Sequence, residues 1–288
     1  MKILALVLLL SALSSLTHME VVERFRRSRC SKFFIKSPGQ NHVITPTVLK
    51  GNQYKRICQR WENEYRFATL YDTKNRIPVY SAYKYIGERK TVRNKDWKNE
   101  PQLESRSYTA DMKEITDAEM DEYYNQAVNR DYIEYTRGHV FPCGYAADQD
   151  QADSTFTFTN IAPQTEHSNS EWAKKVEEKM KNDIKTKCRP NVDKTNVVTG
   201  VIPGENWISI KRKKEIEKNG INIPKYFWTA YCCINGKNEH ISKAYLFLIN
   251  EQNNKTFELT EMSVDRMNHH LKNFYKQDFT IFGDLCLT

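Results

Sequence analysis

One short stretch of the chain combines a histidine and an arginine at a spacing that suits acid–base chemistry. In Thr136-Arg137-Gly138-His139 the two side chains stand two residues apart. Side chains alternate between the faces of a β-strand, so Arg137 and His139 would project from the same face. A nearby guanidinium would lower the pKa of the imidazole and keep it neutral near pH 7, able to take a proton from water beside a phosphate. A half-exposed structural histidine is the alternative for an isolated triplet.

A second group of polar residues follows at a spacing that suits a magnesium site. Asn160 ends an expected strand, and Asn169 lies in the first turn of a helix for which Ser168 is the expected cap. Eight residues on, Glu177 would project within about 80° of Asn169, at about 100° per residue. An amide oxygen and a carboxylate are hard oxygen ligands of the kind that Mg²⁺ uses. The alternatives are a helix-capping asparagine and a solvated glutamate.

Hydrophobic periodicity and turn signals predict the elements that must hold these residues. Residues 67–71 and 77–83 form an expected hairpin, with Pro78 at a sheet edge or a bulge. Thr116 and Ser168 each precede a glutamate by three residues, the pattern of a capping box. The other expected strands are 135–141, 154–159, 196–202, 226–233 and 244–249, and the expected helices are 116–127, 168–187 and 264–274.

Strands before and after one central helix indicate an α+β domain on an antiparallel or mixed β-sheet core. Residues 90–111 are polar and irregular, and we expect a long surface loop there. The helix over 168–187 has one apolar stripe, because Trp172, Val176 and Met180 repeat every four residues.

The N-terminus indicates secretion. Lys2 precedes the apolar run 3–10 and a group of small residues, the pattern of a signal peptide over about residues 1–18. We therefore expect residues 19–288 to form a single secreted domain with N- and C-terminal extensions and without a membrane anchor. The 44 Lys and Arg residues exceed the 36 Asp and Glu residues, for a net charge of +8. This surplus suits a polyanionic partner, although a merely soluble basic protein would explain it as well.

Cysteine usage agrees with an oxidising compartment. Seven cysteines follow the expected signal peptide, so most should pair and one should stay free or form an intermolecular bond. Cys232 and Cys233 are adjacent on an expected strand and should point to opposite faces, toward different partners. The sequence gives no further guide to the pairing.

The ordered set of motifs resembles the ββα-metal family of DNA/RNA non-specific endonucleases, and most closely its secreted endonuclease domain-containing 1 members. Each string alone is modest evidence, and the order of the set makes the resemblance specific from about Cys58 to about Cys233. The resembling segments are 67–72, 76–83, 136–142, 159–164, 197–200 and 223–228, together with Asn169, Trp172 and Glu177.

The resemblance implies a role for each polar residue. His139 matches the general base, and Asn169 matches the one direct protein ligand of the metal. Glu177 matches an acidic residue that acts through metal-bound water. The implied metal is Mg²⁺, with Mn²⁺ as a possible substitute.

Three further positions matter for the phosphate. Asn160 and Arg137 match polar groups that hold the site and the phosphate. Lys181 stands where some members carry a phosphate-binding arginine, and lysine lacks the bidentate fork of that residue. Thr136 departs from the family, whose usual residue there is an aspartate that supports the geometry of the site. The departure puts metal affinity and rate in doubt, not the base or the ligand.

The predicted function is therefore phosphodiester hydrolysis of DNA and RNA with little sequence preference, leaving 5′-phosphate products. The alternative is a secreted nucleic-acid-binding or interaction protein that kept the fold and lost catalysis, with Thr136 as the sign of that loss. A phosphoesterase for small substrates is a third possibility, but it would leave the basic surplus without a use.

Overall fold

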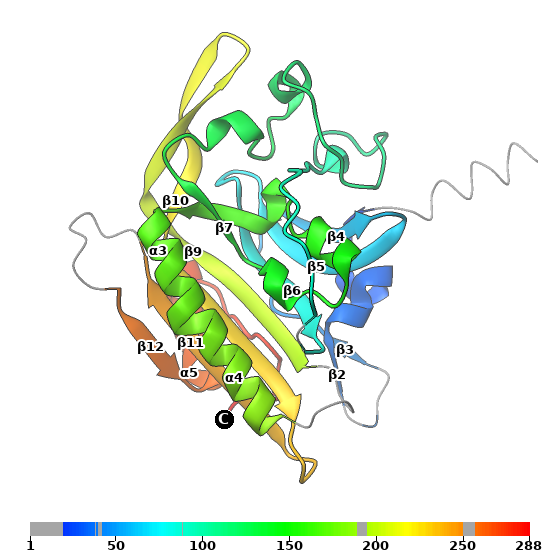
Figure 1. Ribbon diagram of the computed structural model, residues 1–288, viewed down its shortest axis with the longest axis vertical. Helices are drawn as coiled ribbons and strands as arrows, with labels where there is room; N and C mark the ends of the chain where they lie inside the picture. The colour runs from blue at the N-terminus through cyan, green and yellow to red at the C-terminus, as the bar shows by residue number, and fades with distance from the viewer. Residues whose placement is uncertain (1–19, 38, 40–41, 88, 189–194, 250–256) are drawn as a thin grey trace, which may run out of the picture.

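An eight-stranded antiparallel sheet forms the centre of the computed structural model (Figure 1), which describes residues 20–288 apart from 38, 40–41, 88, 189–194 and 250–256. The strand order is β1-β4-β5-β6-β9-β10-β11-β12. The expected signal peptide lies outside the described residues. The strands of this sheet are β1 (Val21–Val22), β4 (Tyr54–Trp61), β5 (Glu64–Asp72), β6 (Ile77–Tyr85), β9 (Thr195–Arg212), β10 (Glu215–Ile234), β11 (His240–Leu248) and β12 (Leu259–Met262).

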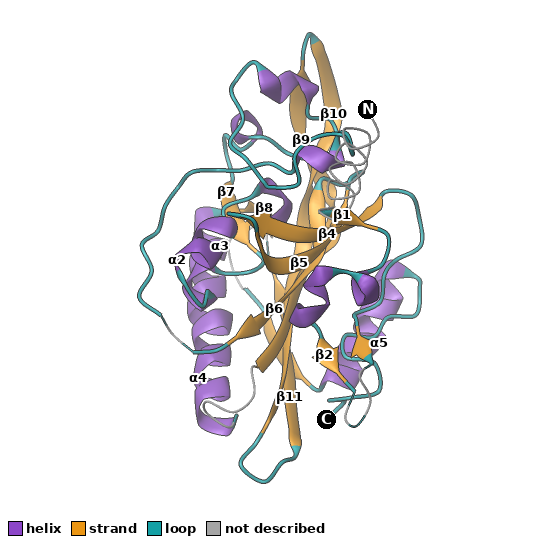
Figure 2. Ribbon diagram, turned by 90° about the vertical axis from the view of Figure 1, so that its right-hand side faces the viewer, coloured by secondary structure: helices purple, strands orange, loops and turns teal. Residues whose placement is uncertain are grey.

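Helices cover both faces of the sheet (Figure 2). On one side lie α3 (Glu166–Trp172) and α4 (Glu178–Lys187), and on the other lies α5 (Val264–Tyr275). The predicted stripe of Trp172, Val176 and Met180 is buried in the core on the first side. Val264, Met267 and Leu271 of α5 are buried in the core on the second side, behind the expected cap at Ser263. The α+β prediction is confirmed.

A second, two-stranded sheet carries the predicted histidine. In it β7 (Thr136–His139) pairs with β8 (Ile161–Gln164), and β8 leads into α3 after a single residue (Figure 2). Residues Ala173–Glu177 form a π turn that joins α3 to α4 in one continuous helix. Two antiparallel strands followed by a helix make the ββα unit that the resemblance implied.

The prediction of a strand over residues 154–159 is wrong. Helix α2 (Gln149–Ser154) ends there and the strand begins only at Ile161. The hydroxyls of Ser154 and Thr155 donate to the carbonyls of residues three positions back, which favours a turn over a sheet. Asn160 therefore precedes the strand instead of ending one.

The helix expected at 116–127 is also wrong, because only Glu119–Glu122 forms a short 3-10 turn. The capping box is present, with the Thr116 amide donating to the Glu119 carboxylate at 2.8 Å. Beyond it, the Gln126 side chain bonds both the amide and the carbonyl of Glu100 at 2.8 Å. These long-range bonds hold the chain in an extended path.

Three smaller expectations need correction or refinement. The cap of α3 is Thr165, whose hydroxyl accepts from the Ser168 amide at 3.1 Å, so Ser168 is not the cap. The segment 90–111 is irregular as expected, but Lys98 to Glu100 are buried and not at the surface. Pro78 lies at a register shift between β5 and β6, which is the bulge that its ring predicted.

The β9–β10 hairpin extends well beyond the body of the protein (Figure 1). Beside it lies a cavity of about 890 Å³, lined by residues that include Ile133, Tyr135 and Trp207. No helix among the described residues is long and apolar enough to cross a membrane. The remaining elements are β2 (Ile35–Lys36), β3 (Val43–Ile44) and the 3-10 turns Phe25–Arg27, Arg29–Phe33, Pro101–Leu103, Asn129–Asp131, Cys143–Tyr145 and Phe158–Asn160.

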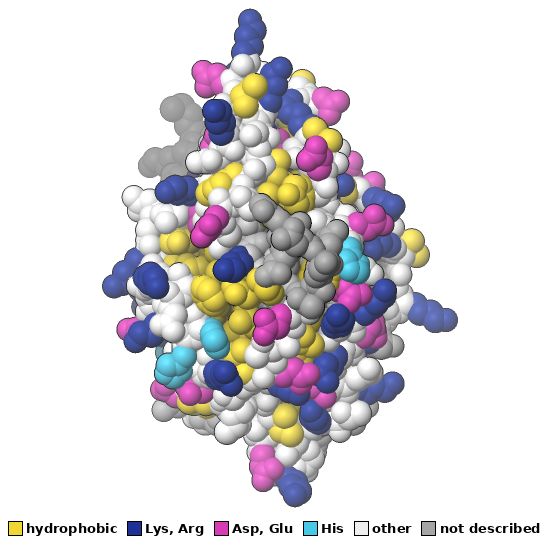
Figure 3. All heavy atoms as spheres, turned by 90° about the vertical axis from the view of Figure 1, so that its left-hand side faces the viewer, with side chains coloured by type: hydrophobic (Ala, Val, Ile, Leu, Met, Phe, Trp, Pro, Cys, Tyr) yellow, Lys and Arg dark blue, Asp and Glu magenta, His cyan; other side chains and the backbone are white. Residues whose placement is uncertain are grey.

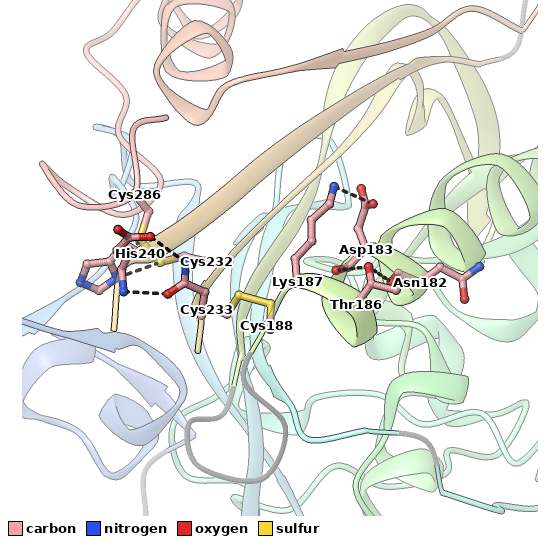
Figure 4. Close-up of a disulfide and its surroundings, with 11 residues drawn as sticks. Asn182, Asp183, Thr186, Lys187, Cys188, Cys232, Cys233, His240 and Cys286 are labelled. Carbon is pink, nitrogen blue, oxygen red and sulfur yellow. Dashed lines mark hydrogen bonds and ion pairs between the residues drawn. A yellow bond between two sulfur atoms is a disulfide. The ribbon is translucent and has the colours of Figure 1, made fainter. Parts of the chain in front are cut away.

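Six of the seven cysteines form disulfides, namely Cys30–Cys58, Cys188–Cys233 and Cys232–Cys286, and Cys143 is free. The odd count is thus explained by one free thiol. As predicted, the two adjacent cysteines of β10 have different partners: Cys233 bonds to the end of α4, and Cys232 bonds to the C-terminal segment (Figure 4).

Candidate active site

His139 ends β7 inside an aromatic enclosure. Its ring lies 4.8 Å from the ring of Phe156 and 5.6 Å from that of Trp97, centroid to centroid. The side chain is 9% exposed, and its Nε2 atom has no hydrogen-bond partner among the described residues. A buried imidazole nitrogen without a partner is unusual unless a ligand or a reacting group meets it.

The electrostatic environment keeps His139 neutral. Burial, followed by the charge of Arg93, lowers the pKa of the imidazole to about 3. The direction agrees with the sequence prediction, but the cause differs, because burial and Arg93 replace Arg137 as the origin of the shift. At pH 7 the imidazole is therefore a proton acceptor.

Arg137 lies on the same side of β7 as His139, as the alternation predicted. Its guanidinium stands 4.9 Å from the centroid of the Trp97 ring, the ring that also contacts His139. One of its terminal nitrogens donates to the Asn129 side chain at 2.7 Å. The Nε atom of Arg137 has no partner within the described part of the chain. The guanidinium is thus oriented by two contacts and keeps donor capacity for an anion.

Arg93 is a site residue that sequence reasoning missed. It is exposed, and its guanidinium lies 5.7 Å from the Phe156 ring centroid. Its charge lowers the pKa values of three groups: His139, Cys143 and Glu177. Arg93 and Trp97 both come from the irregular segment 90–111, where no periodic pattern or motif marks a residue. Only the tertiary packing brings them to β7.

Asn160 uses its side chain to hold the backbone that follows His139. Its Oδ1 accepts from the Phe141 amide at 3.0 Å, and its Nδ2 donates to the carbonyls of Phe141 and Thr155, both at 3.0 Å. Its own carbonyl accepts from the Val140 amide at 2.8 Å. The side chain is fully buried. Asn160 is thus arranged to shape the site and does not face solvent.

Asn169 and Glu177 lie on the continuous helix that follows β8. Asn169 is half-buried in the second turn of the helix from its cap at Thr165, and Glu177 closes the π turn. An α-helical turn holds 3.6 residues and a π turn about one more, so about eight residues complete two turns. The two side chains, eight residues apart, should therefore lie closer to alignment than the expected 80°.

The carboxyl of Glu177 has a shifted pKa. Burial raises it to about 7, against the opposing charges of Arg93 and Lys181. Lys181 itself forms an ion pair with Glu178 at 2.7 Å. Lys181 is close enough to Glu177 for its charge to act on that carboxyl. To bind a phosphate, Lys181 would have to leave Glu178 or contact both groups.

Two small residues of β7 fix its register against β8. The Thr136 hydroxyl donates to the carbonyl of Gln164 at 2.9 Å, at the end of β8 from which the chain enters α3. A Cβ atom on Gly138 would come within 2.0 Å of Oε1 of Gln164, so a larger residue would displace that side chain. Thr136 thus supports the junction of the ββα unit with a hydroxyl.

The basic surplus of the chain does not form a single patch on the face in Figure 3. There Lys and Arg side chains alternate with Asp and Glu around an apolar area. On the helix, Lys175 pairs with Glu171 at 2.7 Å, and Lys179 pairs with Glu261 at 3.1 Å. In the part of the chain that the structure describes, Arg137 and Arg93 are the cations that contact the rings around His139.

Known proteins resemble this chain in sequence and in fold. The endonuclease domain-containing 1 proteins of Homo sapiens and Mus musculus are 31% and 29% identical to it over 211 and 214 residues. The chain spans 38% of the length of each, and each match covers 71% of the chain. In the solved structure "Crystal structure of the EndoG/EndoGI complex: Mechanism of EndoG inhibition", one chain matches at a TM-score of 0.54. That match has 16% identity and covers 92% of this chain and 94% of the other.

The family assignment rests on the extent of the sequence match. The model of the DNA/RNA non-specific endonuclease family matches residues 47–279, which include the ββα unit and most of the central sheet. The chain belongs to the DNA/RNA non-specific endonuclease family.

Proposed function

We propose that the chain is a secreted, Mg²⁺-dependent endonuclease that hydrolyses the phosphodiester bonds of DNA and RNA with little sequence preference. The observation that carries the proposal is His139, a buried imidazole held neutral, with Nε2 unpartnered among the described residues. Arg137 packs on the same indole, and Arg93 acts on the imidazole by its charge. A neutral base beside two cations suits removal of a proton from water next to a phosphate.

The proposed reaction uses His139 as the general base. It takes a proton from a water molecule, which attacks phosphorus in line and displaces the 3′-oxygen, so the product carries a 5′-phosphate. Arg137 and Arg93 would hold non-bridging oxygens of the phosphate, whose charge grows in the transition state. Contacts that go chiefly to phosphate and sugar would explain weak sequence preference.

The donor set on the helix fits a hard divalent cation. Asn169 offers a neutral amide oxygen, and Glu177 offers a carboxylate close to alignment with it. Asn169 would hold Mg²⁺ directly and Glu177 through water, with Mn²⁺ as a possible substitute. When bound, the cation would act as a Lewis acid and neutralise the leaving oxygen. Lys181 would add a positive charge beside this group.

The location is part of the same proposal. The N-terminal pattern favours a signal peptide over about residues 1–18, with residues 19–288 as one nuclease domain. Three disulfides are compatible with export into an oxidising compartment.

A plasmid assay tests the activity directly. Purified protein is incubated with supercoiled plasmid or with RNA, in Mg²⁺, in Mn²⁺ or in EDTA, beside the folded His139→Ala variant. We expect nicking that EDTA abolishes and that the variant loses by a factor of about 10² to 10⁴. Equal nicking by the variant would remove His139 from the role of base.

The rival function is nucleic-acid binding without cleavage. Thr136 in place of the family's aspartate motivates this alternative. The presence of His139, Asn169 and Glu177 together argues against it. If plasmid is retarded in a gel but never cut under any metal condition, the rival is the correct function.

A further inference from the structure

A chain of buried side-chain hydrogen bonds crosses the sheet and ends at Asn160. It runs from a carboxyl group in the irregular segment before Pro101, across β4, β5 and β6. Each member is less than 1% exposed. In order the members are Glu100, Thr159, Gln59, Thr69, Ser81 and Asn160, and the donor–acceptor distances between successive members are 3.0, 2.8, 3.2, 2.9 and 2.9 Å.

The direction of every donor in this chain is fixed by its Asn160 end. The Phe141 amide must donate to Oδ1 of Asn160, so that atom is the amide oxygen. Ser81 therefore donates its only proton to Oδ1, and Thr69 must donate to Ser81. Thr69 can then only accept from the NH₂ group of Gln59.

The second hydrogen of the same NH₂ group goes to Thr159, which leads to Glu100. Thr159 donates its own proton to Oε1 of Glu100, as does Thr157 at 2.8 Å. The chain thus requires an acceptor with two lone pairs at Oε1, and Glu100 supplies it. The other carboxyl oxygen, Oε2, is buried and has no partner among the residues described.

The environment of Oε2 favours the protonated form. Burial and, to a smaller extent, the charge of Asp111 raise the pKa of Glu100 to about 8, against the hydrogen bonds from Thr157 and Thr159, which lower it. Asp111 is itself paired with Arg60 at 2.7 Å. A neutral acid keeps a carbonyl acceptor at Oε1 and places its proton on Oε2, without a buried charge.

We infer that Glu100 is a positioning residue for His139, acting through the hydrogen-bond chain that ends at Asn160. Asn160 makes three hydrogen bonds to Val140 and Phe141, the two residues directly after His139. Loss of the acceptor at Oε1 would let the hydroxyl groups along the chain reorient. The hydrogen bonds by which Asn160 holds Val140 and Phe141 would then weaken. The inference rests on the proposed function for its effect on catalysis, and it adds a requirement for an acceptor at the Oε1 position of Glu100.

An ordinary stabilising contact is the alternative, and four variants separate it from positioning. Glu100→Gln keeps an acceptor at Oε1 and cannot ionise. Glu100→Ala and Thr159→Val break the chain. Thr229→Val removes a buried hydroxyl from the same sheet outside the chain, where Thr229 bonds Thr199 at 2.7 Å, and it is the matched control.

We expect the kinetic constants to separate the variants at pH 7, with each protein assayed well below its own melting temperature. Glu100→Ala and Thr159→Val should lower kcat by about 10- to 100-fold with KM changed less than about two-fold, as expected for a displaced base. The kcat of Glu100→Gln should stay within about three-fold of the wild-type value, and the kcat of Thr229→Val should equal the wild-type value.

Rescue by the conservative variant gives a readout that a structural role would not move. Because Oε1 can accept from Thr157 and Thr159 whether Glu100 is protonated or ionised, the chain needs an acceptor at this position and not a particular charge. Glu100→Gln supplies that acceptor and should therefore keep the kcat that Glu100→Ala loses. Equal losses of kcat in Glu100→Gln and Glu100→Ala would overturn the inference.

Hydrogen exchange makes the test independent of cleavage. The Phe141 amide should exchange about ten-fold faster in Glu100→Ala than in wild type, while an amide of β10 stays unchanged. If wild type cuts no nucleic acid but Phe141 responds in this way, the proposed function fails and the positioning inference stands. If cleavage occurs but Phe141 and kcat do not respond to Glu100→Ala, the inference fails alone.

Discussion

Arg137 and His139 lie against the same indole ring. The guanidinium is 4.9 Å and the imidazole centroid 5.6 Å from the centroid of Trp97. A planar guanidinium suits this stacking and keeps its donors in one plane, whereas an ammonium does neither. Trp97 thus sets the positions of a cation and a base together.

The first prediction concerns Arg137. Arg137→Lys keeps the charge but loses the planar contact with Trp97 and the fork of donors, so we expect kcat/KM to fall by about 10-fold or more. The measurement is cleavage of an oligonucleotide at several substrate concentrations. The control is Arg130→Lys, which changes an arginine that pairs with Asp121. Equal losses in both variants would contradict the assignment.

Burial of His139 predicts a pH-dependent stability. Its folded pKa of about 3 lies below the ordinary 6.5, so the unfolded state binds more protons between these values. His139 should therefore destabilise the fold as the pH falls from about 6.5 toward 3, by at most about 1.4 kcal/mol per pH unit. Thermal unfolding of wild type and His139→Asn between pH 4 and 7.5 tests this. A constant difference across that range would mean that the imidazole is solvated.

Asn169 and Thr165 predict opposite outcomes on the same helix. Because Thr165 is the cap, Thr165→Ala should cost about 1 kcal/mol of stability and leave the Mg²⁺ dependence of cleavage unchanged. Asn169→Ala should keep most of the stability and lose activity that high Mg²⁺ restores little. Asn169→Asp should bind the cation more tightly and cut more slowly. Superimposable Mg²⁺ curves for wild type and Asn169→Ala would rule out the ligand role.

Charge reversal at Arg93 tests the residue that the sequence did not reveal. Arg93→Glu should lower kcat/KM by about 10-fold or more, because a carboxylate would replace the cation that acts on His139 and Glu177. Lys95→Glu, two residues away and also exposed, is the matched control for the change of net charge. The comparison is made at low and at high salt. If Lys95→Glu lowers kcat/KM as much as Arg93→Glu does, the effect comes from the change in net charge and not from a role of Arg93 in the site.

The cysteine pairing predicts the number of free thiols. Unfolded, unreduced protein should react with one equivalent of a thiol reagent, and Cys143→Ser should react with none. Three or more free thiols in the purified protein would contradict the three disulfides.

Much of the fold could be predicted because local pattern and packing agree there. The helix stripe at Trp172 and the α5 stripe at Met267 each face a core, and the alternation in β10 directs Cys232 and Cys233 apart. The errors fall where side chains form long-range polar contacts. Gln126 bonds the Glu100 backbone instead of extending a helix, and Thr157 bonds the Glu100 carboxyl instead of entering a strand.

The candidate site was predictable in its motif and not in its surroundings. The triplet ending at His139 and the helix with Asn169 follow one another in the chain, so their spacing carries information. Arg93 and Trp97 reach the site from an irregular segment whose path depends on buried residues such as Lys98. Such a path depends on tertiary contacts that no local pattern records.

The adjacent cysteines of β10 also have a consequence for assembly. A shift of β10 by one residue would exchange the faces of Cys232 and Cys233, turning each sulfur away from its partner. The bonds to Cys188 and Cys286 can therefore both close only when the strand is seated in its native alignment between α4 and the C-terminal segment. Formation of both disulfides thus requires the native strand alignment. The two bonds stabilise the correctly aligned sheet, whereas a misaligned strand keeps free thiols and can still rearrange.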